Sequence, residues 1–241
     1  MKKLTKSSEL LWVLGVVLVA LGVSICDKAN LGVSMIAAPA FVISEALLSV
    51  YSGFSVGVVE YIFQGLLLII LILLLKKFNL KYLIAFLVAV IYGYVLNFFI
   101  FLLKGVVINS ALTRWVLLII GDIVTAFGVA SFFKTTYPLQ VYELFVTKVA
   151  SVYKFNINKV KLSFDMSLLF ISIILAFTLF GDANTFDWST IACSSFHSIG
   201  LGTLVTTIIN SPIIAFASKV LNKIFDNKPL FERLEKVVKI S

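Results

Sequence analysis

The sequence predicts an all-α polytopic membrane protein with about six transmembrane helices and two short re-entrant or amphipathic helices, arranged as two inverted repeats. Three observations lead to this prediction. Of the 241 residues, 61% are hydrophobic and 13% are charged, which is more apolar surface than a soluble globule can bury. Apolar runs recur at the length that a bilayer requires. The second half of the chain also echoes the first.

An internal repeat in the sequence indicates how the helices are arranged. LGVVLVALGVSICDK (Leu14–Lys28) reappears as IGDIVTAFGVASFFK (Ile120–Lys134). The matched glycines, which share one helical face in each copy, are Gly15 with Gly121 and Gly22 with Gly128. We therefore expect close packing between these two helices. The duplication predicts a first repeat over 1–106, a second over 107–221, and an amphipathic cytoplasmic tail over 222–241.

Six runs are predicted to be spanning helices because most of them approach the ~20 residues that a crossing needs. In chain order they are Leu10–Ile25, Val56–Leu75, Tyr82–Leu103, Trp115–Phe133, Leu162–Phe180 and roughly Gly202–Leu221. The opening residues are similar to the start of a signal peptide. The run that follows is long and lacks a small-residue cleavage site, so we interpret it as a retained first helix.

A weaker apolar segment follows the first strong run of each half, at 33–50 and at 139–153. The first carries Pro39 and Glu45, and the second follows Pro138 and carries Glu143 and Lys148. A charge at the centre of a lipid-exposed helix costs ~2.5 to 3.5 kcal/mol on insertion scales. We therefore expect both segments to line protein or water.

The basic residues indicate whether these short helices cross the bilayer. If they do not cross, and both termini are cytoplasmic, only Lys28, Lys104 and Arg114 fall on the outer side. If both cross, the outer side instead holds Lys28, Lys134 and the cluster of Lys76, Lys77 and Lys81. The positive-inside rule favours six crossings in a cell (inner or plasma) membrane. Each repeat then crosses three times, which inverts the second copy as in alternating-access carriers.

Composition and motifs exclude several classes of protein. The net charge of +8 is explained by basic residues at helix ends, so we expect membrane lipids and no nucleic acid as partners. Cys26, Cys193 and the single His197 offer no metal or haem spacing, so no cofactor is predicted, while a disulfide is left open. The chain has no HExxH, GxSxG or Walker A motif, so we predict neither an enzyme nor an ATP-driven pump.

Three motifs are similar to those of the YczE/YyaS/YitT family of bacterial integral membrane proteins. They are GVSICDKANLGVS (Gly22–Ser34), YPLQVYELF (Tyr137–Phe145) and IGLGT (Ile199–Thr203). The resemblance implies a multi-pass bacterial membrane protein of transporter type. The family segment A-x-L-G-x-x-P-x-D has Met35 and Ala37 here at its Pro and Asp positions. The resemblance thus implies that the first repeat lacks a polar group that the second keeps as Glu143.

Ionisable residues inside membrane segments are the main candidates for a site. Asp122 lies about two turns inside its run and would hold a proton or a cation; alternatively it is a partner for Arg114 or a hydrogen-bonded structural carboxylate. Glu143, with Gln140 and Tyr142 beside it, would bind a cationic group, a proton or a hydroxyl. Its alternative is an interfacial ion pair with Lys148.

Other polar residues have simpler alternatives. Asn30 either contacts substrate or caps a helix, and Glu45 either joins the site or lies at the water boundary. Glu60 and Asp165 match in the two repeats, and we interpret both as carboxylates that stabilise helix N-termini. His197 is interpreted as an interfacial residue rather than a pH gate.

These features predict a secondary transporter of a small polar or charged metabolite that works by alternating access between the repeats. The rival is a non-transporting membrane module that binds a lipid or a protein partner for assembly or regulation. The glycine-rich faces would serve contacts between subunits equally well, so a homo-oligomer is an open alternative. The sequence does not specify the substrate or a coupling ion.

Overall fold

The protein was examined as a computed structural model that describes residues 8–51, 53–76, 78–80, 82–135, 137–181, 192–226 and 228–229. Within these ranges the regular elements are helices, and an isolated bridge joins Phe196 to Ile199. The helices are α1 (Ser8–Ala29), α2 (Ala38–Leu48), α3 (Val56–Leu75), α4 (Tyr82–Leu103), α5 (Ala111–Lys134), α6 (Val141–Val152), α7 (Ile157–Phe180) and α8 (Leu201–Ile224).

The expected polytopic all-α fold is confirmed. Six helices (α1, α3, α4, α5, α7 and α8) are long and apolar enough to cross a membrane, and each contains one of the six predicted runs. Their outer faces carry large apolar side chains such as Leu73, Phe101 and Ile208, which are 69%, 75% and 74% exposed. Lipid is the solvent that such a surface requires.

Each of the two short helices is too short to span a bilayer by itself. α2 has 11 residues and α6 has 12. At ~1.5 Å per residue each is well short of the ~30 Å hydrocarbon core. Both are shorter than the segments predicted from sequence because α2 begins only at Ala38 and α6 only at Val141.

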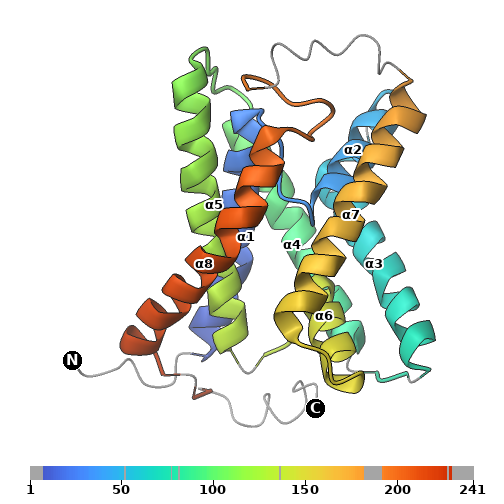
Figure 1. Ribbon diagram of the computed structural model, residues 1–241, viewed down its shortest axis with the longest axis vertical. Helices are drawn as coiled ribbons and strands as arrows, with labels where there is room; N and C mark the ends of the chain where they lie inside the picture. The colour runs from blue at the N-terminus through green and yellow to red at the C-terminus, as the bar shows by residue number, and fades with distance from the viewer. Residues whose placement is uncertain are drawn as a thin grey trace.

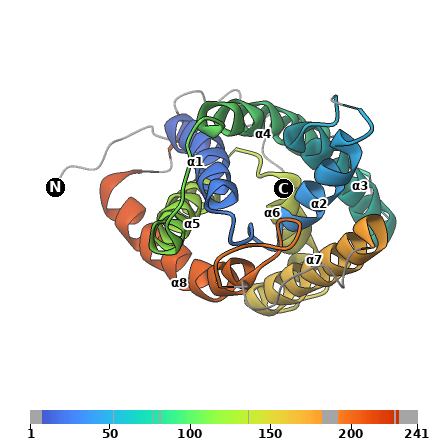
Figure 2. The same ribbon diagram turned by 90° about the horizontal axis from the view of Figure 1, so that it is seen from above.

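The two halves have the same order of helices in opposite orientation. Each runs long, short, long, long, and the short helices α2 and α6 lie toward opposite ends of the molecule (Figure 1). Seen from above, the long helices follow the order α1, α4, α3, α7, α8 and α5 around the molecule (Figure 2). The backbone nitrogen of Ser8 donates to the carbonyl of Lys228 at 3.3 Å, so the two described ends of the chain lie together.

Helices α1 and α5 form the most extensive contact in the protein, as the matched glycines predict. A Cβ on Gly22 would lie 2.6 Å from the carbonyl oxygen of Gly121. A Cβ on Gly121 would lie 2.8 Å from the carbonyl oxygen of Gly22. The small residues therefore allow the two backbones to touch.

The helices pack in two groups that cut across the repeats. One group is α1, α5 and α8, and the other is α2, α3, α6 and α7. Helix α4 packs against α1 of the first group and against α3 and α6 of the second. It therefore bridges the two groups.

One pair of matched interfaces differs between the repeats. α3 and α4 pack extensively, whereas α7 and α8 make at most marginal contact over the residues that the structure describes. Gly57 and Gly93 bring α3 and α4 together, because a Cβ on either would collide with the carbonyl oxygen of the other. The position that matches Gly57 in the second repeat is Leu162, whose side chain prevents the same approach.

The loop before α8 ties together the upper ends of the helices in Figure 1. The amide of Gly202 donates to the carbonyl of Leu31 at 2.8 Å, and that of Val33 donates to Ser198 at 3.0 Å. Nη1 of Arg114 reaches the carbonyl of Cys193 at 2.8 Å. These hydrogen bonds therefore connect the loop and the start of α8 with α5 and with the segment between α1 and α2.

The two cysteines and the C-terminal tail can be compared with what the sequence predicts. Cys26 is buried and Cys193 is exposed, and both are free, so the disulfide that the sequence left open does not form. The predicted tail at 222–241 begins inside α8, which runs to Ile224. Most of the proposed amphipathic helix, at 227 and 230–241, lies outside the described residues.

Candidate functional site

A cavity of about 80 Å³ lies between the two helix groups. A water molecule takes up ~30 Å³ in the liquid, so the space would hold a few waters or a small solute. The cavity is lined from both repeats. Its polar lining residues are Ser34, Glu60, Tyr92, Asp122, Thr125, Gln140, Tyr142, Glu143, Lys161, Asp165, Thr206, Thr207, Asn210 and Ser211.

Both short helices begin at this cavity. The segment Ser34–Ala37 lines it directly before α2, and Gln140, Tyr142 and Glu143 line it at the start of α6. Proline favours these starts, because Pro39 lies in the first turn of α2 and Pro138 shortly precedes α6. The positive ends of two helix dipoles therefore face the same space.

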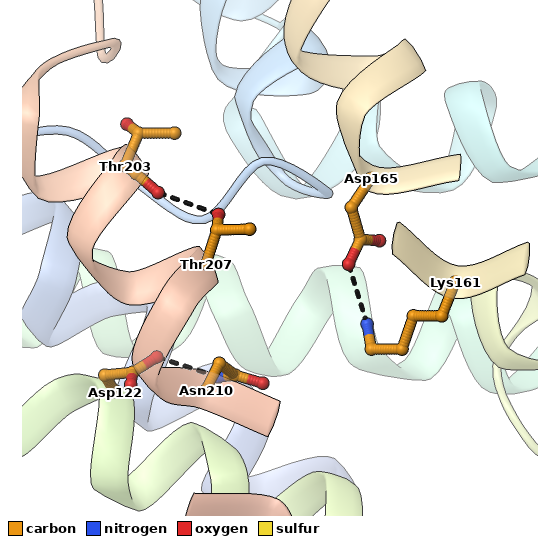
Figure 3. Close-up of polar contacts among 6 residues, drawn as sticks. All are labelled: Asp122, Lys161, Asp165, Thr203, Thr207 and Asn210. Carbon is orange, nitrogen blue, oxygen red and sulfur yellow. Dashed lines mark hydrogen bonds and ion pairs between the residues drawn. The ribbon is translucent and has the colours of Figure 1, made fainter. Parts of the chain in front are cut away.

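Asp122 and Asn210 form one wall of the cavity. Nδ2 of Asn210 on α8 donates to Oδ1 of Asp122 on α5 at 2.7 Å (Figure 3). Asp122 is 2% exposed, and its second oxygen, Oδ2, has no hydrogen-bond partner. The amide thus fixes the carboxylate and leaves one oxygen available.

Lys161 and Asp165 lie across the cavity on α7. Nζ of Lys161 is 3.0 Å from Oδ2 of Asp165, one helical turn away (Figure 3). Among the described residues, Lys161 is the only basic residue that lines the cavity. The positive charge of Lys161 is thus largely neutralised by Asp165, one of the four described carboxylates that line the cavity.

A third polar group joins α3 to the start of α6. Oε1 of Gln64 accepts the backbone N–H of Val141 at 3.3 Å, where no side chain caps α6. Glu60, one turn before Gln64, is 1% exposed. The hydroxyl of Tyr142 lies near the carboxylate of Glu60, but the two groups do not have the geometry of a hydrogen bond.

Glu143 belongs to the short helix α6. Burial raises the pKa of its carboxyl to about 7, against smaller lowering contributions from its own backbone N–H and from Lys161. Glu143 would therefore change its protonation state near neutral pH.

The cavity holds most of the unpartnered buried polar atoms in the described part of the chain. They are Oε2 of Glu60, Nε2 of Gln64, Oδ2 of Asp122, Nε2 of Gln140, the hydroxyl of Tyr142, Oε2 of Glu143 and Oδ1 of Asp165. All except Gln64 come from lining residues. Each buried polar group without a partner costs ≈1–3 kcal/mol, so this arrangement requires water, an ion or a solute in the cavity.

Four residues that the sequence proposed for a site meet here: Asp122, Gln140, Tyr142 and Glu143. Arg114 donates to the carbonyls of Cys193 and Ile108, and the described partner of Asp122 is Asn210, so the expected Asp122–Arg114 pair is not found. The bond from Asn210 agrees with the alternative of a hydrogen-bonded structural carboxylate.

Asn30 and Glu45 lie outside the cavity lining. Asn30 follows α1 with φ +53°, and its Oδ1 accepts from Oγ of Ser195 at 2.7 Å. Oε1 of Glu45 lies 2.9 Å from Nδ1 of His197, whose ring stacks on Phe180 with centroids 3.5 Å apart. Both residues thus belong to the upper loop contacts, and the interpretation of His197 as an isolated interfacial residue misses its carboxylate neighbour.

Sequence reasoning missed Glu60 and Asp165 as members of the site. Both were interpreted as helix N-terminal carboxylates, yet Glu60 is the fifth residue of α3 and Asp165 the ninth of α7, and both are buried against the cavity. The signal was present, because the two acids match in the repeats. Asn210 had no comparable signal: a single amide in a span becomes informative only when its partner Asp122 is seen.

Comparison with known proteins places the chain in a family. Residues 6–219 match the model of a family of unknown function, DUF6198. The chain belongs to that family. No curated protein and no solved structure matches it. Family membership agrees with a membrane protein of this helical kind and adds no activity, so the function must be argued from the cavity.

Proposed function

We propose that this chain is a secondary transporter of a small polar or charged solute and that the central cavity is its binding site. The observation that carries the proposal is the set of unpartnered polar atoms around a buried space between two helix groups. A purely structural core would satisfy these atoms internally. A site that binds and releases a solute must leave them available.

The packing supports alternating access as the mechanism. The groups α1–α5–α8 and α2–α3–α6–α7 are joined mainly through α4, so one group can rock against the other about that helix. The sequence suggested that the repeats themselves would move. The observed grouping, which takes helices from both repeats, instead favours the two groups as the moving bodies.

The difference in packing between the two repeats supports access to the cavity from one side of the membrane. Hydrogen bonds of the loop before α8 connect the upper ends of the helices in Figure 1, while α7 and α8 make at most marginal contact over the described residues. With both termini on the cytoplasmic side, as the basic residues favour, the cavity would exchange with the cytoplasm between α7 and α8. We include in this proposal the bacterial inner membrane as location and kinship with the YczE/YyaS/YitT proteins.

Exchange in liposomes tests the proposal. Purified protein is reconstituted into liposomes loaded with a defined mixture of amines, amino acids, carboxylic acids and polyols, and the external medium is followed by mass spectrometry. We expect at least one solute to leave only when protein is present and to stay inside with Asp122→Asn/Glu143→Gln. Glu45→Gln, a carboxylate change outside the cavity, is the matched control. Absence of protein-dependent exchange under outward and inward gradients would contradict transport and favour the lipid- or partner-binding module.

A further inference from the structure

We propose that the central cavity binds a small organic cation of the ammonium or guanidinium class between Glu60 and Asp122 and exchanges it for one proton held by Glu60. This inference deepens the proposed transport function and rests on it only for the movement across the membrane. The binding step stands on the geometry of the cavity alone.

The charge balance of the lining calls for a positive ligand. Four carboxylates line the cavity, from four different helices, against the single amine of Lys161. Lys161 pairs with Asp165, and the start of α6 lies beside Glu143. Glu60 and Asp122 therefore have no cationic partner among the described lining residues.

Both carboxylates also present unused acceptor atoms. Glu60 is 1% exposed and Asp122 is 2% exposed, and Oε2 of the first and Oδ2 of the second lack hydrogen bonds. A carboxylate in a buried site is satisfied by an added proton or by a cationic N–H donor. An ammonium or guanidinium group supplies both the charge and several donors.

The placement of acids on facing walls of the cavity suits a polyatomic cation. Across the described residues, no group of three or more His, Cys, Asp or Glu side chains is placed to hold a metal. Asp122 and Asp165 lie on facing walls, on α5 and α7 (Figure 3). A ligand with donors pointing in more than one direction fits walls of this kind.

The remaining lining suits the carbon atoms of such a ligand. Val19, Val23 and Ile36 provide apolar surface, and Tyr92 and Phe164 provide aromatic rings that attract cations. The volume of about 80 Å³ accommodates a small organic cation.

The titratable groups around the cavity define the exchange. They are Glu60, Asp122, Glu143, Asp165, Lys161, Tyr92 and Tyr142, with the buried thiol of Cys26 behind Asp122. Without a cation, the buried carboxyl of Glu60 keeps a proton, and Asp122 accepts the hydrogen bond from Asn210. When a monovalent cation binds, Glu60 releases its proton to the solvent, so one positive charge replaces another and no net charge moves into the buried site.

Guanidinium and urea form a matched pair of probes, because they have the same planar shape and differ in charge. Binding of guanidinium, methylammonium, urea and acetate to the detergent-purified protein is measured by calorimetry in two buffers of different ionisation enthalpy. We expect guanidinium or methylammonium to bind with proton release, and urea and acetate not to bind. Glu60→Gln and Asp122→Asn should each weaken cation binding at least tenfold, while Glu45→Gln leaves it unchanged. Thermal unfolding of each variant identifies any that fail to fold.

Other outcomes separate this inference from the function. Equal binding of urea and guanidinium, cation binding unchanged in both Glu60→Gln and Asp122→Asn, or a cavity that takes only water would overturn the cation site. Cation binding without exchange in liposomes would overturn transport and leave the cation site standing. Protein-dependent exchange of anions or neutral solutes, without cation binding, would do the reverse.

Discussion

Asn210 on α8 donates to Oδ1 of Asp122 on α5 at 2.7 Å and leaves Oδ2 of the carboxylate unpartnered. This contact joins two helices of one packing group and orients a buried acid at the edge of the other. It gives Asp122 a defined direction in a membrane interior where an unsupported carboxylate would be costly.

Loss of this amide should reduce ligand affinity more than stability. We expect Asn210→Ala to weaken binding of the transported solute about tenfold, because Asp122 loses the donor that orients it; one charge-assisted hydrogen bond contributes ≈1.5–3 kcal/mol. Calorimetry measures the affinity, and Asn158→Ala, at an exposed amide near the start of α7, is the control. Equal losses in both variants would argue against an orienting role for Asn210.

Binding of a cation should depend on pH through Glu143. Burial raises the pKa of this carboxyl to about 7, so it is neutral below that value and negatively charged above it. From one unit below to one unit above, the ionised fraction and hence the affinity should rise about tenfold. Glu143→Gln should flatten this part of the profile. Binding that weakens as pH rises would contradict the assignment.

The α1–α5 contact should tolerate no added side chain. Gly22→Ala would drive a methyl group into the backbone of Gly121, and overpacking of this kind costs roughly 1–3 kcal/mol. We expect a clear drop in the midpoint of thermal unfolding in detergent. Gly105→Ala is the matched control, since nothing lies within 4 Å of its added Cβ. A similar midpoint for both variants would show that the close approach carries no stability.

Rocking about α4 should change the separation of α7 and α8 and leave the separation of α3 and α4 unchanged. Spin labels on exposed Lys159 and Lys219 report the separation of α7 and α8, and labels on Leu73 and Leu83 report α3 and α4. Pulsed electron resonance in liposomes should show a ligand-dependent shift for the first pair. The second pair should keep a single distance because Gly57 and Gly93 lock the α3–α4 contact. A shift confined to the second pair would place the movement elsewhere.

The spans and the glycine contact could be predicted from sequence because they depend on local properties. Hydropathy marks each long helix, and the match of Gly22 with Gly128 marks the face along which α1 meets α5. The short helices could be predicted only approximately. The residues before α2 and α6 are apolar as well, and where each helix begins depends on the proline and the tertiary contacts.

The site could be predicted in part. Asp122 and Glu143 were identifiable because an acid within a membrane segment is costly, so that it usually serves a function. Glu60 was not, because a position near a helix start offers a local explanation that sequence alone cannot test. Asn30 and Glu45 are polar residues of the expected kind, yet the upper loop takes up their hydrogen bonds through Ser195 and His197. That loop is distant in sequence from both.

Tracer counterflow tests the account most directly. Liposomes containing the protein and loaded with unlabelled guanidinium are diluted into labelled guanidinium, and uptake is followed with time. The account predicts a transient accumulation of label above equilibrium for the wild type and for Glu45→Gln, and none for Glu60→Gln. Wild-type protein that binds guanidinium yet shows no accumulation, or a Glu60→Gln variant that accumulates label normally, would contradict a transport site in this cavity.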